Sequence, residues 1–179
     1  MQVDFWLFQQ INGLAGKFAW LDWLGIFLAS YYQYLVVGAL LLFIFISQDK
    51  KEQISRARMA GLAFLAALVA RFGVVTTIYY FYIRLRPFVA HAATQLISYD
   101  AAKPSFPSGH ATFFFALAMV VYLYNKKIGA WFLAAALLIS LARVYAGVHY
   151  LSDILAGVLI GSLVGWGVWE IAKKAKLIN

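Results

Sequence analysis

The sequence contains no cysteine and few charged residues. Without cysteine, the chain has neither a disulfide framework nor a thiolate metal site. Only 12% of its residues are charged, against about 25% in soluble domains. No basic segment followed by a small-residue cleavage site opens the chain, so we expect no signal peptide. In place of charge the chain has 64% hydrophobic residues, 18% of all residues being aromatic. This composition predicts an integral membrane protein.

The net charge of +8 is distributed as short clusters between apolar segments. This placement is typical of membrane topology signals, so we expect no nucleic-acid partner. One side of the expected membrane carries Lys50, Lys51, Arg56, Arg58, Lys126, Lys127, Lys173, Lys174 and Lys176. The other side carries fewer cationic residues, namely Lys17, Arg84, Arg86, Lys103 and Arg143. The positive-inside rule therefore predicts that the first side, with the C-terminus, is cytoplasmic.

Five apolar segments are candidate membrane spans. A spanning helix needs about 20 apolar residues, and residues 23–46 form an uncharged segment of this kind. The others are residues 59–83, 106–124, 128–146 and 150–170, separated by connectors at 47–58, 84–105 and 125–127 and by a tight turn near Gly147. Residues 1–22 have apolar side chains at helical spacing, which favours an interfacial helix, with a sixth span as the alternative. We predict an all-α, polytopic membrane helix bundle forming one domain over residues 1–179, with the transmembrane core at 23–172.

Three polar clusters lie at the expected outer ends of these spans. They are the "RLRPF" segment with Arg84 and Arg86, the "PSGH" segment at residues 107–110, and the "ARVYAGVHYLSD" segment at residues 142–153. The topology brings them to one membrane level, where ionisable residues are costly and indicate function.

His149 and Asp153 are spaced four residues apart, so on one helix the carboxylate could orient the imidazole. Arg86 and Arg143 offer charged forks that match phosphate oxygens. Ser108 and backbone N–H groups at Gly109 could bind the same anion. With His110 as an acid, this set favours phosphoryl transfer through a phosphohistidine.

Arg86-Pro87, Pro107-Ser108-Gly109-His110 and Arg143-x5-His149-x3-Asp153 together resemble the three-part signature of the type-2 phosphatidic acid phosphatase family. The resemblance implies a metal-independent lipid phosphatase without a cofactor. It assigns His149 as nucleophile, Asp153 as its orienting partner and His110 as general acid. By the same resemblance the phosphate-binding residues are Arg86, Arg143, Ser108 and Gly109.

Two positions depart from the family pattern. Tyr79 stands where the first motif usually has Lys, and Ala142 stands where the third motif usually has Ser. Arg84 or Lys103 could replace the missing cation, and Tyr79, Arg84 and Lys103 are the possible auxiliary residues of the site. The missing Lys, the small size and "RPFVAH" resemble the bacterial undecaprenyl-diphosphate phosphatases of this family. That resemblance implies a polyprenyl diphosphate substrate, a role in recycling the cell-wall lipid carrier, and an active site on the outer face of the plasma membrane.

Other readings of these residues stay open. Phosphatidylglycerophosphate and phosphatidic acid are alternative substrates. Ser108, His149 and Asp153 could instead form an intramembrane Ser-His-Asp protease. A third hypothesis is a carrier that binds polyprenyl phosphates without turnover.

Three further features are interpreted as structural. Arg71, within a span, is expected to pair inside the bundle or to snorkel. His91 lacks a partner motif and is expected to be structural or to contact lipid headgroups. Gly157, Gly161 and Gly165 indicate close helix packing, with a homodimer face as the alternative.

Overall fold

A computed structural model describes residues 2–178 and places most of them in helices, with no strand among them. The all-α prediction is confirmed for this part of the chain. The elements are α1 (Gln2–Asn12), α2 (Ala19–Ser30), α3 (Tyr32–Phe45), α4 (Lys50–Leu68), a π-helix η1 (Val69–Val75), α5 (Thr76–Phe81), α6 (Pro87–Ala90), α7 (Gly109–Tyr124), α8 (Lys126–Tyr145) and α9 (Leu151–Lys174).

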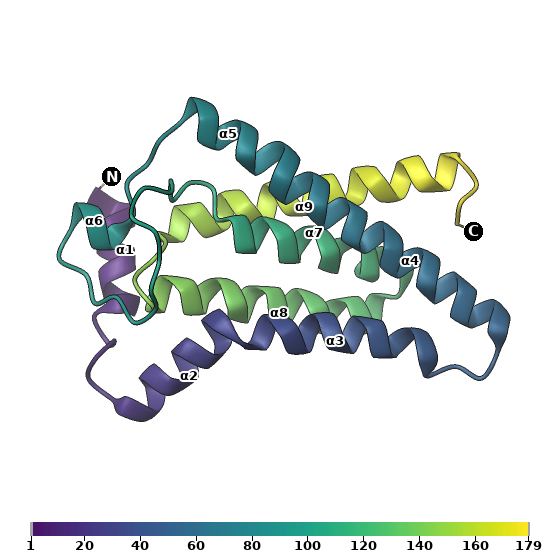
Figure 1. Cartoon of the computed structure of the whole chain (residues 1–179), viewed down its shortest axis with the longest axis horizontal. Helices are drawn as coiled ribbons and strands as arrows, with labels where there is room; N and C mark the ends of the chain where they lie inside the picture. The colour runs from purple at the N-terminus through teal and green to yellow at the C-terminus, as the bar shows by residue number, and fades with distance from the viewer. Residues whose placement is uncertain (1, 179) are drawn as a thin grey trace.

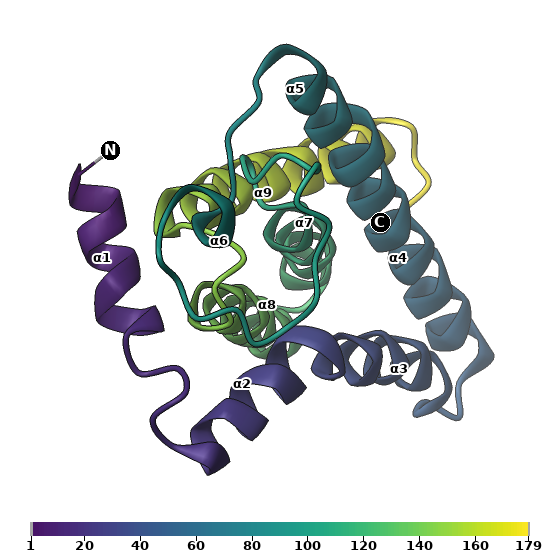
Figure 2. The same ribbon diagram turned by 60° about the vertical axis from the view of Figure 1, so that its left-hand side comes forward.

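Helix α7 lies at the centre of the bundle. It packs against α4, η1, α8 and α9, which surround it in the end-on view (Figures 1 and 2). Its own residues are mostly buried, including Phe114, Leu117 and Val121. Apolar residues lie on most faces of α7, as is usual for a helix surrounded by other helices. The N-terminal end of α7 is therefore enclosed by the ends of its neighbours.

The expected spans are only partly reproduced. Three helices are long and apolar enough to cross a membrane: Lys50–Phe81, Lys126–Tyr145 and Leu151–Lys174. Helices α2 and α3 qualify together as a fourth, although they meet at an angle of 48°. Helix α7, with 16 residues, is shorter than a typical span. The predicted count of five spans is therefore not confirmed.

Two boundaries in the prediction were wrong. The first apolar segment, residues 23–46, is not one straight helix but breaks at Tyr31. The connector expected at 47–58 is mostly helical, because α4 already begins at Lys50. Its start is fixed by Asp49, whose carboxylate accepts a hydrogen bond from the Lys51 N–H at 2.9 Å. Charged residues were taken as loop residues, whereas here they form the polar first turns of a membrane helix.

The N-terminal segment contains an 11-residue helix, α1, which is too short to cross a bilayer. It ends at Asn12, whose side-chain amide donates to the carbonyl oxygens of Thr94 and Tyr145, both at 2.8 Å. Phe8, a residue of α1, is fully buried. Helix α1 is thus docked against α8 and α9, near the turn that joins them. The helical repeat expected over residues 1–22 does not continue as one helix past Asn12.

The glycine face of α9 packs within the chain. A Cβ atom at Gly157 would lie 2.7 Å from the Ala111 Cβ, and one at Gly165 would lie 2.6 Å from the Ala116 carbonyl oxygen. Gly161 faces the same helix, α7. Close helix packing is confirmed, with α7 of the same chain covering this face.

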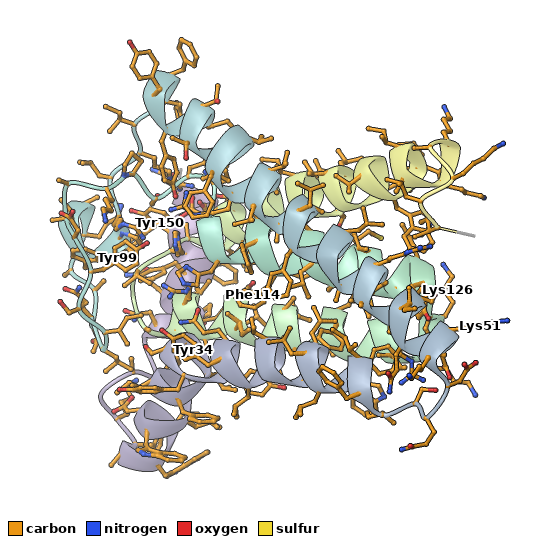
Figure 3. The ribbon with its side chains drawn as sticks, turned by 45° about the vertical axis from the view of Figure 1, so that its right-hand side comes forward. Tyr34, Lys51, Tyr99, Phe114, Lys126 and Tyr150 are labelled. Atoms are coloured by element: carbon orange, nitrogen blue, oxygen red, sulfur yellow. The ribbon has the colours of Figure 1, made fainter. Side chains whose placement is uncertain are left out.

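The two ends of the bundle differ in character. Lys51 and Lys126 lie at one end, whereas Tyr99 and Tyr150 lie at the opposite end (Figure 3). The long connector after α5 and the turn before α9 both belong to the second end (Figure 1). A tight turn near Gly147 was predicted, and Gly147 there has a φ of +82°, a conformation that favours glycine. This turn brings the C-terminal end of α8 and the N-terminal end of α9 together beside α7.

Candidate active site

His149 and Asp153 form a buried pair at the turn before α9. The His149 Nδ1 lies 3.3 Å from an Asp153 Oδ, and neither side chain is exposed. The expected contact is present, but for a different reason: His149 precedes α9 rather than sharing a helix face with Asp153. The same carboxylate oxygen accepts a hydrogen bond from the Tyr150 N–H at 2.8 Å. Asp153 thus closes the helix start and holds the imidazole at once.

The protonation state of His149 follows from its neighbours. Burial lowers its pKa to about 4, an effect that Asp153 opposes. The carboxylate can only accept, so Nδ1 carries the proton. On the other side of the ring, an Nη of Arg86 lies 3.3 Å from Nε2. A guanidinium can only donate, so Nε2 presents its lone pair. The ring is therefore neutral and in the tautomer that a nucleophile requires.

Arg86 is held in place by main-chain oxygens. Its guanidinium donates to the carbonyls of Lys103 at 3.0 Å, Pro104 at 2.8 Å and Val148 at 2.8 Å. The side chain is 1% exposed, and burial lowers the pKa of the guanidinium. These bonds tie the long connector to the turn that carries His149. Arg86 thus has a structural role that its motif did not predict, beside the phosphate contact proposed for it.

The Tyr99 ring lies beside Arg86, Arg143 and His149. The Arg86 Cζ lies 3.8 Å from the centre of the Tyr99 ring, and the Arg143 Cζ lies 5.8 Å from it. The His149 ring is 6.4 Å away, nearly perpendicular. Sequence reasoning missed Tyr99, because a lone aromatic residue in an irregular connector gives no periodic signal. Tyr99 is labelled at the end of the bundle opposite Lys51 and Lys126 (Figure 3).

Arg143 and His110 are brought together from α8 and α7. An Nη of Arg143 lies 2.8 Å from the His110 Nε2 and donates to the Ala29 carbonyl at 3.2 Å. The Nε and the other Nη of Arg143 are buried and have no hydrogen-bond partner among residues 2–178. Buried unpaired donors are costly, so these two N–H groups mark a place for an acceptor.

The "PSGH" segment forms the N-terminal end of α7, as predicted. Ser108 caps the helix, its hydroxyl accepting from the Ala111 N–H at 3.4 Å. The Ser108 N–H donates to the Asp153 carbonyl at 3.0 Å, which fixes α7 against α9. Free N–H groups and the positive end of the helix dipole lie at Gly109. No hydrogen bond joins Ser108 to His149 within residues 2–178, so the described contacts do not form a Ser-His-Asp triad.

The three auxiliary candidates lie in different surroundings. Arg84 donates to Asp153 at 2.6 Å, to Ser152 at 2.7 Å and to Asp4 at 2.5 Å. Burial lowers its pKa, but the two carboxylates outweigh burial and raise the pKa overall. Arg84 therefore supports Asp153 from behind. Lys103 is exposed, with its Nζ 4.0 Å from an Asp100 Oδ.

Tyr79 is uncharged and contacts the "PSGH" segment. Its hydroxyl donates to the Pro107 carbonyl oxygen at 2.9 Å. The guanidinium of Arg71 lies over the same ring, with Cζ 5.7 Å from the ring centre. Tyr79 thus holds the connector that leads into α7, and a cation reaches its neighbourhood from η1. His91, by contrast, stacks on Phe5 at 3.9 Å, outside the cluster.

The assembled residues suit one kind of chemistry. A neutral imidazole lone pair, a second imidazole and two cationic forks, mostly buried, lie near the N-terminal end of α7. Phosphoryl transfer depends on such positioning and on charge stabilisation. No group of three or more His, Asp or Glu side chains within residues 2–178 is arranged to hold a metal ion.

Comparison with known proteins gives consistent matches. The sequence profile of the PAP2 superfamily matches residues 60–177. Undecaprenyl-diphosphatase BcrC of Bacillus subtilis is 30% identical over 164 residues, covering 92% of this chain and 81% of BcrC. The lipid A 4'-phosphatase of Porphyromonas gingivalis is 26% identical over 179 residues, covering 96% of this chain and 73% of that protein. The crystal structure of Aquifex aeolicus LpxE has a TM-score of 0.73 and 27% identity, covering 94% of this chain and 95% of LpxE.

Proposed function

The chain belongs to the PAP2 superfamily, and from this we propose that it hydrolyses undecaprenyl diphosphate to undecaprenyl phosphate and inorganic phosphate. The resemblance inferred from the three motifs is confirmed by the match, which includes all of them. The chain is accordingly an integral membrane phosphatase. The choice of substrate draws on the relatives' names, of which the undecaprenyl-diphosphatase of B. subtilis has the higher identity.

The observation that carries the proposal is the orientation of His149. Its Nδ1 faces Asp153 and its Nε2 faces the Arg86 guanidinium. A phosphate bound by Arg86 and Arg143 would lie next to the imidazole lone pair. A carbonyl substrate would not need two guanidinium groups. The geometry supports attack on phosphorus.

In the first step the His149 Nε2 attacks the terminal phosphorus of the lipid diphosphate. The bond between that phosphorus and the bridging oxygen breaks, and its electron pair leaves with the oxygen. His110 supplies a proton to this oxygen, so undecaprenyl phosphate departs. Asp153 stabilises the imidazolium that forms, as in other oriented-histidine sites. Arg86 and Arg143 bind the equatorial oxygens, on which charge is spread in the transition state.

In the second step water attacks the phosphohistidine. His110, now neutral, takes a proton from the water, and the N–P bond breaks with its electron pair returning to Nε2. Inorganic phosphate leaves and the neutral histidine is restored. No metal or cofactor takes part in this scheme.

The site lies at the end of the bundle opposite the lysine clusters (Figure 3). By the positive-inside rule that end is the outer face of the plasma membrane. Undecaprenyl phosphate released there would be recovered for cell-wall synthesis. The long prenyl chain remains in the bilayer while its headgroup reaches the helix ends.

A substrate panel tests the proposal. The purified protein is given undecaprenyl diphosphate, phosphatidic acid, phosphatidylglycerophosphate and lipid A in one detergent with EDTA present. We expect fastest phosphate release from the diphosphate. Preference for a phosphate monoester would overturn the assignment of substrate, and lipid A is the leading second candidate given the P. gingivalis relative. Tight binding of undecaprenyl diphosphate without release would favour a carrier.

A further inference from the structure

Arg71 is a charged side chain within the longest membrane helix, and it has no described partner. It lies in the π-helix η1, a type of helix that is frequent at functional sites. Its guanidinium makes no hydrogen bond and no ion pair with any side chain or carbonyl of residues 2–178. The rings of Phe72 and Tyr79 lie near it, with centres 5.4 and 5.7 Å from Cζ. A permanent charge at this depth calls for an anion.

The guanidinium reaches the N-terminal end of α7. A Cβ atom built at Gly109 would lie 2.9 Å from the Arg71 Cζ, so this glycine leaves the space that Arg71 occupies. The next residue is His110, the proposed acid. Arg71 is therefore adjacent to the leaving-group side of the reaction, although its own helix carries none of the catalytic histidines.

Arg71 and His110 also line one cavity of about 240 Å³. Its remaining walls come from α3 and α7 and are mostly apolar: Gln33, Tyr34, Val37, Gly109, Phe113 and Phe114. Arg71 is the only lining residue that bears a permanent charge. Tyr34 and Phe114 mark this side of the bundle, between α3 and α4 (Figure 3). The cavity thus combines one cationic contact with surfaces suited to a hydrocarbon chain.

The in-line geometry of phosphoryl transfer indicates which part of the substrate lies near Arg71. In phosphoryl transfer the attacking and leaving atoms lie roughly in line on opposite sides of phosphorus. If His149 attacks and His110 protonates, the leaving group lies on the side of His110, Arg71 and the cavity. For a lipid diphosphate, that leaving group is a lipid phosphate.

We propose that Arg71 is a specificity-determining residue that binds the phosphate retained by the lipid, while Arg86 and Arg143 bind the phosphate that is removed. The inference rests on the function proposed above and goes beyond it, because it assigns the two phosphates of the substrate to different cations. A lipid with a single phosphate has no group for Arg71 to bind.

The test compares the wild-type protein with Arg71→Gln and Arg71→Lys. Farnesyl diphosphate is the substrate, and inorganic phosphate is a competitive inhibitor that reports on the transferred-phosphate position alone. We expect Arg71→Gln to lower kcat/KM by about 10–100-fold, as for loss of a hydrogen bond to a charged group. The inhibition constant of inorganic phosphate should stay within about twofold of wild type. Arg71→Lys should recover much of the loss.

A matched control is Arg58→Gln, at the exposed cytoplasmic end of the same helix, which should leave both constants unchanged. Equal changes in kcat/KM and in the inhibition constant of inorganic phosphate would overturn the proposal that Arg71 binds the phosphate retained by the lipid. An unaffected kcat/KM would overturn it as well. Failure of the wild-type protein to hydrolyse any prenyl diphosphate would overturn the proposed function. This outcome differs from failure of the Arg71 proposal, because it is seen in the wild-type protein before any residue is replaced.

Discussion

An Nη of Arg143 lies 2.8 Å from the Nε2 of His110, and two other nitrogens of the same guanidinium are buried without a partner among residues 2–178. Since arginine only donates, the His110 Nε2 accepts this bond and is unprotonated. A bound phosphate offers Arg143 better acceptors than an imidazole. Phosphate binding would thus draw the guanidinium from His110 and free its Nε2 to carry the proton for the leaving group.

Replacing Arg143 tests this exchange. We expect Arg143→Gln to lower kcat/KM by about 10²–10³-fold, the range for loss of one preorganised charge-stabilising donor. Arg143→Lys should recover only part of the activity, because a point charge cannot contact both His110 and phosphate. Phosphate-release kinetics in detergent measure both variants. Near-wild-type activity in Arg143→Gln would contradict the proposed role.

The nucleophile is tested by His149→Ala. We expect phosphate release to fall to background, because no other described imidazole is oriented by a buried carboxylate. Acid-labile, alkali-stable label from [³²P]-substrate should appear in the wild-type protein and be missing in the variant. His91→Ala is the control: His91 is exposed and stacks on Phe5 outside the cluster, so activity should persist. Label retained in His149→Ala would place the nucleophile elsewhere.

The ionisation of His149 predicts an unusual titration. Its pKa is lowered to about 4 by burial, so the neutral, attacking form persists as the pH falls from 7 to about 5. A variant with His91→Asn and His110→Asn leaves His149 as the single histidine, since the chain has three. Imidazole ¹⁵N NMR of this variant should show a midpoint well below 6.5. A midpoint near 6.5 would mean that water reaches the ring.

Arg84 is proposed to position Asp153. Arg84→Lys keeps the charge but loses the fork that contacts Asp153, Ser152 and Asp4 together. We expect kcat to fall about 10–100-fold through misplacement of the His149 pair, with KM little changed. If Arg84 instead bound phosphate, KM would rise along with the loss of kcat. Steady-state kinetics separate these results.

The packing of α9 on α7 predicts a difference between two glycines. A Cβ at Gly161 would lie 2.9 Å from the Ala116 backbone nitrogen and 3.1 Å from the Phe115 Cβ. Overpacking of this kind costs about 1–3 kcal/mol, so Gly161→Ala should lower the Tm in detergent. Gly167→Ala on the same helix meets no atom within 4 Å and should leave the Tm unchanged or raise it. Equal shifts would show that α9 packs differently.

The contact between His149 and Asp153 could be predicted because it follows from their local spacing. His149 and Asp153 are close in the sequence, and a helix beginning between them has few ways to keep them apart. The connection of these residues to Arg86 depends on carbonyl groups of Lys103, Pro104 and Val148, which any residue type supplies. That part of the site left no trace in the sequence.

The helix break at Tyr31 and the position of Arg71 were unpredictable for a related reason. Neither glycine nor proline marks the bend between α2 and α3, so composition predicts one span. Arg71 was conspicuous as a charge within a span and was interpreted as structural. Its approach to Gly109 depends on where η1 crosses α7, which is a property of the packed bundle and not of either helix.

The docking of α1 has a consequence for how the protein is made. Asp4 and Asn12 are synthesised long before their partners Ser152 and Tyr145. Until α9 has entered the membrane, Arg84 lacks Asp153, and His149 lacks its carboxylate. A chain that ends before Asp153 therefore lacks the carboxylate that contacts His149. Helix α1 can dock only after the turn between α8 and α9 has been synthesised, so these contacts form late in synthesis.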